Sequence, residues 1–174
     1  MESEPQRTPI ERLLVILFIA LLVGVVGVLF QLSHDDEAPV VPEFALSSLD
    51  GGMWDDDGLQ GEITVLNFFA TWCGPCVQEM PELVRFYDSH RGTVRLLGVS
   101  AGYDDVKEVR DFAGKHGARW PILLGGEVLL GRFGTAGLPT TVILDAESRV
   151  RWIWTGPVDR AQLEDAIAEL DASP

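Results

Sequence analysis

The residues best suited to chemistry are the only two cysteines of the chain, Cys73 and Cys76, with Gly74 and Pro75 between them. This spacing allows both thiols to lie on the first turn of one helix. There the first sulfur lies beside unpaired backbone N–H groups and the positive end of the helix dipole, which favour thiolate over thiol. We therefore expect Cys73 to be the nucleophile and Cys76 to be the resolving thiol. Pro75 restricts the backbone and helps to hold the thiols together.

The same spacing is compatible with a permanent disulfide or with half of a metal site. A loop this short gives a disulfide little entropic stabilisation, so a purely structural bridge is the weaker interpretation. Zinc usually needs four ligands. The three histidines, His34, His90 and His116, are scattered, and there is no second cysteine pair. We therefore expect no metal site and no cofactor, with Cu(I) held by the two thiolates as the alternative.

Charge restricts the partners of the chain. Its 174 residues include 27 acidic and 13 basic side chains, which gives a formal net charge of −14 at pH 7. No basic cluster is present to neutralise phosphates, so we expect no binding of nucleic acid. The length fits one domain plus an appendage, and a hydrophobic content of 47% is ample for a packed core.

The appendage is the apolar run 13–32, in which Gln31 is the only hydrogen-bonding side chain. Twenty helical residues span about 30 Å, the hydrocarbon thickness of a bilayer. Arg7 and Arg12 precede the run, and the next basic side chain is Arg85. The positive-inside rule therefore predicts a single-pass anchor with its N-terminus in the cytoplasm and the rest of the chain outside. A cleaved signal peptide is the alternative, but the run is longer than the usual 7–15 residues and lacks a small-x-small site.

We divide the chain into a cytoplasmic segment 1–12, a transmembrane anchor 13–32, an acidic, proline-bearing linker 33–42 and a domain 43–174. Hydrophobic periodicity within the domain predicts alternating elements. The expected strands are 44–49, 53–54, 63–70, 94–100, 121–124, 140–144 and 150–155. The expected helices are 76–90, one that is capped by Asp104 or Asp105 and reaches roughly to His116, 127–133 and a last one capped by Asp159. This order predicts an α/β fold with a mixed central sheet and helices on both faces.

The helix 76–90 should bury one side against the sheet. Its apolar residues at helical spacing are Val77, Met80, Leu83, Val84 and Tyr87. The strand 63–70 is apolar and β-branched throughout, which predicts a central strand buried on both faces.

Two motifs identify a resemblance. The first is Asn67 to Cys76 (NFFATWCGPC) followed by Glu79-Met80-Pro81, and the second is Gly137-Leu138-Pro139-Thr140-Thr141 ahead of a strand. Their order and separation resemble the thioredoxin superfamily and, within it, the membrane-anchored TlpA/ResA-like thiol–disulfide oxidoreductases. The likeness covers roughly residues 42–170. It implies a thioredoxin-like fold for nearly all of the soluble part.

The resemblance also implies roles for further residues. Pro139 corresponds to the family's cis-proline, which faces the cysteine pair. A cis bond there would expose the backbone of Leu138 so that a substrate segment could pair with it as an extra strand. We therefore expect Leu138, Pro139 and Thr140 to bind substrate. Trp72 is expected to flank the active-site surface, with ordinary packing as the alternative.

Two polar positions distinguish the subfamily. Ordinary thioredoxins carry a buried aspartate where this chain has Asn67, which cannot titrate; we expect Asn67 to be a hydrogen-bonded core residue. ResA-like proteins carry a glutamate at the position of Glu79, one helical turn after Cys76. A partly buried carboxylate with a raised pKa could take the proton from Cys76. The alternative is that Glu79 lies on a solvated helix face.

The expected function is that of an extracytoplasmic thiol–disulfide oxidoreductase, acting as a reductant of protein disulfides through Cys73 and Cys76. Gly-Pro between the cysteines matches reducing thioredoxins. The resemblance implies an integral membrane electron donor and apocytochrome c as a substrate. The alternatives are a dithiol oxidant and a reductant or Cu(I) metallochaperone for copper-site assembly. A peroxiredoxin is disfavoured because no Pro-x-x-x-Thr-x-x-Cys pattern surrounds Cys73.

Overall fold

The computed structural model describes residues 9–32 and 38–171, which form two separate units divided after Glu37. In the first unit, helix α1 spans Pro9–Leu32. Its window Pro9–Val26 has a mean hydropathy of 2.4, so by length and composition this helix could cross a membrane and serve as an anchor. A signal sequence shares both properties. Residues 1–8 of the expected cytoplasmic segment and residues 33–37 of the expected linker lie outside the described residues.

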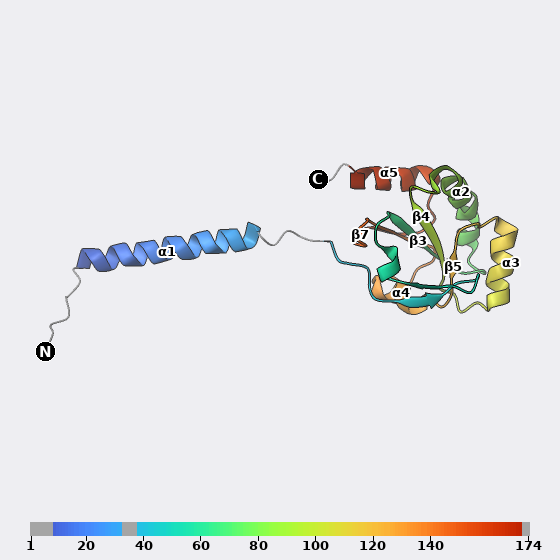
Figure 1. Ribbon diagram of the computed structural model, residues 1–174, viewed down its shortest axis with the longest axis horizontal. Coiled ribbons are helices and arrows are strands. Elements are labelled where there is room, and N and C mark those ends of the chain that lie inside the picture. The colour runs from blue at the N-terminus through green and yellow to red at the C-terminus, as the bar shows by residue number, and fades with distance from the viewer. Residues whose placement is uncertain (1–8, 33–37, 172–174) are drawn as a thin grey trace. The chain divides into compact units, whose positions relative to one another are not determined.

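The second unit is built on a mixed five-stranded sheet with the order β5-β4-β3-β6-β7 (Figure 1). Strands β3 (Thr64–Phe69), β4 (Arg95–Ser100) and β5 (Ile122–Leu123) are parallel, whereas β6 (Thr140–Leu144) and β7 (Val150–Thr155) join antiparallel. All residues of β3 are buried, as its apolar, β-branched run predicts, and all residues of β6 are buried as well. A separate hairpin pairs β1 (Ala45–Ser47) with β2 (Met53–Asp55), and a short 3-10 helix, η1, covers Asp57–Leu59.

Helices cover both faces of the sheet and create two cores. On one face α2 (Gly74–His90), α3 (Val106–His116) and α5 (Arg160–Asp171) pack on side chains such as Val65, Leu96 and Ile143. On the other face α4 (Glu127–Arg132), η1 and the hairpin pack on Leu66, Leu97 and Val142. The predicted fold class and element order are therefore confirmed.

Capping fixes where two of these helices begin. Asp105 and Glu108 form a reciprocal capping box at the start of α3, and Gly117 ends that helix in the left-handed conformation with φ 75°. At α5, Asp159 accepts from the backbone N–H of Gln162 at 2.8 Å, and the Gln162 side chain accepts from the N–H of Asp159 at 2.9 Å. Both caps follow the sequence pattern.

The structure differs from the sequence prediction at two places. Val77 is 36% exposed, because the buried stripe of α2 runs through Cys76, Glu79, Met80, Leu83 and Phe86 instead. In addition, the second unit begins at Ala38, five residues before the predicted domain boundary. Val41 is buried and its N–H donates to Ser148, while Val150 donates to the carbonyl of Pro39, so these residues are part of the domain.

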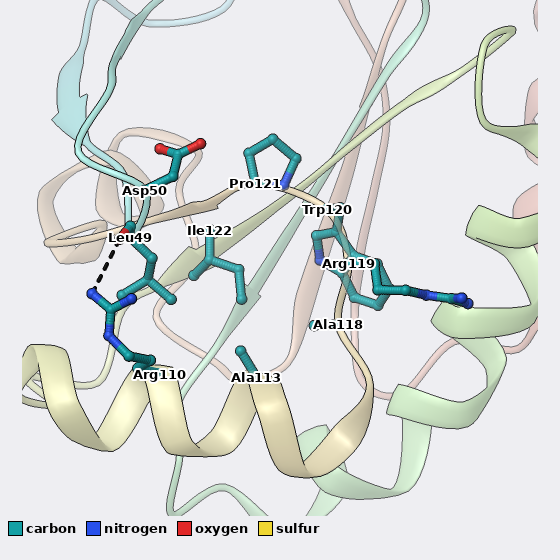
Figure 2. Close-up of a pocket in the computed structure, with 9 residues that line it drawn as sticks. All are labelled: Leu49, Asp50, Arg110, Ala113, Ala118, Arg119, Trp120, Pro121 and Ile122. Atoms are coloured by element: carbon teal, nitrogen blue, oxygen red, sulfur yellow. Dashed lines mark hydrogen bonds between the residues drawn. The ribbon is translucent and has the colours of Figure 1, made fainter.

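A pocket of about 350 Å³ lies between α3, β5 and the segment after β1 (Figure 2). Figure 2 shows Arg110 and Ala113 on α3 facing Leu49 and Ile122, with the Arg110 guanidinium donating to the carbonyl of Leu49 at 3.1 Å. Neither cysteine lines this pocket. The cavity is therefore not the redox site.

Candidate active site

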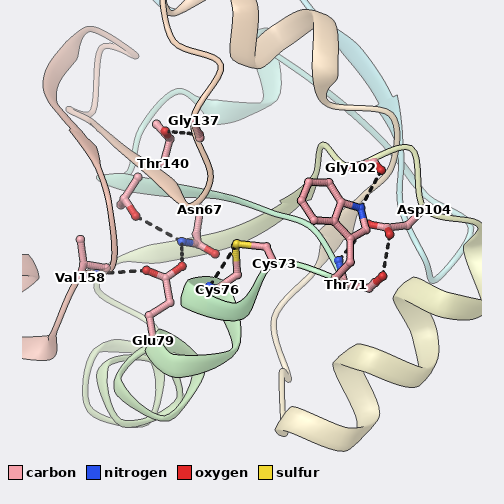
Figure 3. The surroundings of a disulfide bond; sticks show 12 residues. Asn67, Thr71, Cys73, Cys76, Glu79, Gly102, Asp104, Gly137, Thr140 and Val158 are labelled. Atoms are coloured by element: carbon pink, nitrogen blue, oxygen red, sulfur yellow. Dashed lines mark hydrogen bonds between the residues drawn. A yellow bond between two sulfur atoms is a disulfide. The ribbon is translucent and has the colours of Figure 1, made fainter.

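The cysteine pair lies where β3 passes into α2, beyond the carboxyl end of this central strand (Figure 3). Cys73 is the N-cap of α2, and its sulfur accepts from the backbone N–H of Cys76 at 3.2 Å. The two residues form a disulfide. Cys73 is 5% exposed and Cys76 is fully buried. Solvent and substrate therefore reach the sulfur of Cys73 first, which agrees with its expected role as the nucleophile.

A buried carboxyl group lies one helical turn after Cys76. Glu79 is only 2% exposed, so it is not a solvated surface residue. Its Oε1 accepts from the Asn67 side-chain amide at 2.8 Å, and its Oε2 accepts from the backbone N–H of Val158 at 3.1 Å. Burial raises the pKa of Glu79 to about 7, although both hydrogen bonds favour the ionised form and oppose that shift. The group can therefore exchange a proton near neutral pH.

Asn67 connects this carboxyl group to the strand beside it. The Asn67 amide also donates to the hydroxyl of Thr141 at 3.2 Å, and the two residues face each other in the antiparallel pairing of β3 and β6. Asn67 is 1% exposed. Asn67 is therefore a hydrogen-bonded core residue, as the sequence predicts. It holds Glu79 in place without adding a second titratable group.

The loop before β6 carries the expected cis-proline. The peptide bond between Leu138 and Pro139 is cis, as the resemblance implies. Pro139 is buried and Leu138 is half-buried, packing against both cores. Thr140 is fully buried; its hydroxyl donates to the carbonyl of Gly137 at 2.8 Å. The side chain of Thr140 thus holds the loop, while substrate binding by Leu138, Pro139 and Thr140 stays a prediction.

The segment just before the cysteines is fixed to the loop that follows β4. Asp104 accepts from the Thr71 backbone N–H at 3.0 Å and from its hydroxyl at 2.6 Å. The Trp72 indole N–H donates to the carbonyl of Gly102 at 3.1 Å, while the residue stays 69% exposed. Trp72 therefore flanks the site at the surface, and it is not an ordinary packed core residue.

The sequence did not identify Asp104 or Val158 as part of this site. The sequence pattern offers Asp104 only as a helix cap, a role that Asp105 fills. Only its acidic side chain, two residues after Gly102, could have suggested that Asp104 accepts hydrogen bonds from the segment before the cysteines. The N–H of Val158 is a backbone group 79 positions from Glu79, and no residue type encodes it.

The arrangement can carry out thiol–disulfide exchange. It provides a disulfide whose first cysteine is 5% exposed and whose second is fully buried, together with a carboxyl group of pKa about 7 one helical turn further along α2. Among the residues that the structure describes, no group of three or more His, Cys, Asp or Glu side chains is placed to hold a metal ion.

Comparisons with known proteins agree with this reading. The AhpC/TSA family model matches residues 38–153, two thirds of the chain. Thiol-disulfide oxidoreductase ResA of Bacillus thuringiensis (strain Al Hakam) is 27% identical over 163 residues, covering 89% of this chain and 94% of the relative. ResA of Geobacillus kaustophilus (strain HTA426) is 31% identical over 125 residues, covering 71% of each.

The same likeness holds in three dimensions. The crystal structure of StoA from Bacillus subtilis superimposes with a TM-score of 0.62 at 26% identity, covering 74% of this chain and 98% of StoA. Family model, relatives and fold thus agree with the geometry around the two cysteines. The chain belongs to the AhpC/TSA family and is a thiol–disulfide oxidoreductase with a thioredoxin-like fold.

Proposed function

We propose that this oxidoreductase acts as a reductant outside the cytoplasm and transfers two electrons from the Cys73–Cys76 dithiol to disulfides of exported proteins. The observation that supports this direction is the type of ionisable group near the cysteines. In the hydrogen-bonded network of Asn67, Thr141 and Val158, that group is the carboxyl of Glu79. A dithiol becomes oxidising when its reduced thiolate is stabilised. A neighbouring carboxylate disfavours a thiolate, and this supports the reducing direction.

The proposed reaction has two exchange steps. The Cys73 thiolate attacks one sulfur of the substrate disulfide; the S–S bond breaks, the other substrate sulfur leaves as a thiolate, and a mixed disulfide forms. Glu79 then accepts the proton of the Cys76 thiol, and the Cys76 sulfur attacks the sulfur of Cys73. The second substrate thiolate leaves, and the protein remains as the disulfide seen here. The substrate gains the two electrons that the protein loses.

Three finer assignments belong to this proposal. The substrate is the oxidised Cys-x-x-Cys-His segment of apocytochrome c, which must be reduced before haem attachment. An integral membrane protein re-reduces the disulfide of Cys73 and Cys76. Helix α1 stays uncleaved as the anchor, because its apolar run is longer than that of a signal peptide. The N-terminus lies in the cytoplasm, because Arg12 precedes this run and no lysine or arginine follows until Arg85.

Trapping of the mixed disulfide tests the proposal. In a Cys76→Ala variant the second step cannot occur, so the substrate should stay linked to Cys73. A Cys73→Ala variant is the matched control and should trap nothing, because Cys76 is fully buried. Recovery of apocytochrome c from cells would support the specific substrate. Recovery of copper-site proteins alone would contradict that assignment and favour copper-site assembly.

The direction of electron transfer needs a separate measurement. We expect equilibration of the full chain with thiol redox buffers to give a reduction potential near that of thioredoxin, about −270 mV. A value near that of DsbA, about −120 mV, would make the protein a dithiol oxidant and refute the reducing role. Tight retention of Cu(I) without disulfide reductase activity would instead indicate a metallochaperone.

A further inference from the structure

Two loops flank the segment that leads to Cys73. The register pairs Phe69 with Ser100 on one side and Phe68 with Thr140 on the other. The residues after β4, from Ala101, and the residues before β6, up to Pro139, therefore lie on either side of the entrance to α2. A substrate segment that pairs with the backbone of Leu138 must therefore pass close to these two loops.

A small pocket opens between these loops. Its volume is about 190 Å³, and it lies between the loop after β4, helix α4 and the residues that lead into the cis-proline. Ala101 and Leu130 supply apolar walls, Tyr103 and Glu127 a polar side, and Ala136 stands two residues before Leu138. Sites for whole small molecules usually exceed about 300 Å³. The pocket therefore suits one side chain of a longer ligand.

The charge of the pocket is negative. Glu127 supplies the only carboxylate of its lining; the Oε1 atom accepts from the backbone N–H of Tyr103 at 2.9 Å. None of the ion pairs found within residues 38–171 involves Glu127. The loop after β4 adds the carboxylates of Asp104 and Asp105, and the first turn of α3 adds that of Glu108. The ammonium of nearby Lys107 is held by Asp111 at 2.6 Å.

Tyr103 completes the pocket in an unusual backbone conformation. Its φ of 58° lies in the left-handed region, which is uncommon for a residue other than glycine, and 89% of the residue is exposed. Strain of this kind is kept where the surroundings hold it, and here the hydrogen bond to Glu127 does so. An exposed phenol ring beside a carboxylate can attract a cation through its π face.

We propose that this pocket is a subsite for a lysine or arginine side chain of the substrate polypeptide, adjacent to the disulfide that Cys73 attacks. The aliphatic stem of such a side chain would pack on Ala101 and Leu130, and its charged end would meet Glu127 and the ring of Tyr103. The subsite rests on the proposed exchange with protein disulfides and adds the charge class of the substrate segment.

Peptide exchange kinetics test this subsite. Oxidised Cys-x-x-Cys peptides would carry lysine, leucine or glutamate in turn at each of the three positions on either side of the cysteines. Reduced full-length protein in uncharged detergent would then be mixed with each peptide at pH 7. At one or more positions we expect lysine to react about fivefold faster than leucine, and glutamate to react more slowly still.

The variants separate the subsite from general charge effects. Glu127→Gln keeps an acceptor for the Tyr103 N–H but removes the charge, so the preference for lysine should disappear. Glu147→Gln, on an exposed turn at the opposite end of β6, should keep it. Each rate is divided by the rate of the same variant with uncharged hydroxyethyl disulfide, which corrects for changes in cysteine reactivity.

Three results would each overturn the subsite. The first is equal rates for the lysine and leucine peptides at every position, and the second is faster reaction of the leucine peptides. The third is a preference for lysine that persists in the Glu127→Gln variant. Normal reduction of hydroxyethyl disulfide in that case would leave the reductant proposal intact. If the reduced protein reacts with no disulfide, the reducing role fails instead. The same charge comparison is then made in reverse, with oxidised protein and reduced peptides, and the same outcomes decide it.

Discussion

Replacing Glu79 with glutamine should stabilise the oxidised protein at pH 8 and change its stability little at pH 5. The pKa of Glu79 is about 7 in the folded protein, against 4.5 as its ordinary value. Between these two values the folded state holds a proton that the unfolded state has released. The stability contributed by this proton is therefore complete below pH 4.5, decreases as the pH rises, and is lost above pH 7.

The structure sets the size of this effect. At 1.36 kcal/mol per pKa unit, the difference between 4.5 and about 7 corresponds to ~3 kcal/mol of unfolding free energy. Glutamine resembles the protonated carboxyl in shape and charge and does not titrate. A flip of the Asn67 amide would turn its oxygen toward the new NH₂ group as an acceptor, while the glutamine oxygen would accept from the backbone N–H of Val158. The variant should therefore gain most of the ~3 kcal/mol at pH 8.

Tryptophan fluorescence during urea unfolding provides the measurement. All tryptophans lie in the second unit (Trp54, Trp72, Trp120, Trp152 and Trp154), so the signal from the full chain in detergent reports that unit. Comparing variants at the same pH cancels the titration of every other group. Glu147→Gln is the control and should show the same difference from the original protein at pH 5 and pH 8, because Glu147 is exposed.

The opposite pH trend would refute this reasoning. If Glu79→Gln has the same effect at pH 5 and pH 8, the carboxyl does not titrate in this range. If it lowers stability more at pH 8 than at pH 5, the ionised carboxylate stabilises the fold through its two hydrogen bonds, and burial is the smaller effect.

Three further outcomes are expected. Asp104→Ala removes both hydrogen bonds to Thr71 and should lower the free energy of unfolding by ~2 kcal/mol in urea titrations; an unchanged value would mean that these bonds add nothing. Gly102→Ala should cost ~2 kcal/mol or more in the same assay, because a Cβ there would lie 2.3 Å from that of Ala70, so a neutral result would require the loop to move freely. Deletion of residues 1–37 should release the protein from membranes in sedimentation assays, while persistent membrane binding would indicate a second attachment.

Sequence patterns predicted the elements whose signals are local. The apolar run of β3 and the cap at Asp159 are encoded within a few neighbouring residues, and each was found where expected. The cysteine pair is local in the same sense, because its chemistry depends on the first turn of α2. Periodicity was less reliable at Val77, where the buried stripe is rotated toward Cys76.

Contacts between distant segments could not be predicted from such patterns. Val158 reaches Glu79 through a backbone N–H, a group that every residue except proline carries, so the sequence contains no sign of it. The choice between Asp104 and Asp105 as the helix cap depends on the position of Thr71, which the fold brings near. Pro39 and Val41 looked like linker because their pairing with Ser148 and Val150 is tertiary.

In the proposed mechanism, the buried carboxyl group of Glu79 connects stability to function. At neutral pH, burial of the Glu79 carboxyl lowers the free energy of unfolding by ~3 kcal/mol. This is a large fraction of the 5–15 kcal/mol by which an ordinary domain is stable. Glutamine at the position of Glu79 would avoid this cost, yet it could not accept the proton of Cys76. Asn67 and Val158 reduce the penalty by donating to the two carboxyl oxygens, and they leave the pKa near the pH at which a proton acceptor works best. A residue that weakens the fold while being held by two specific donors is more readily explained by proton transfer than by packing.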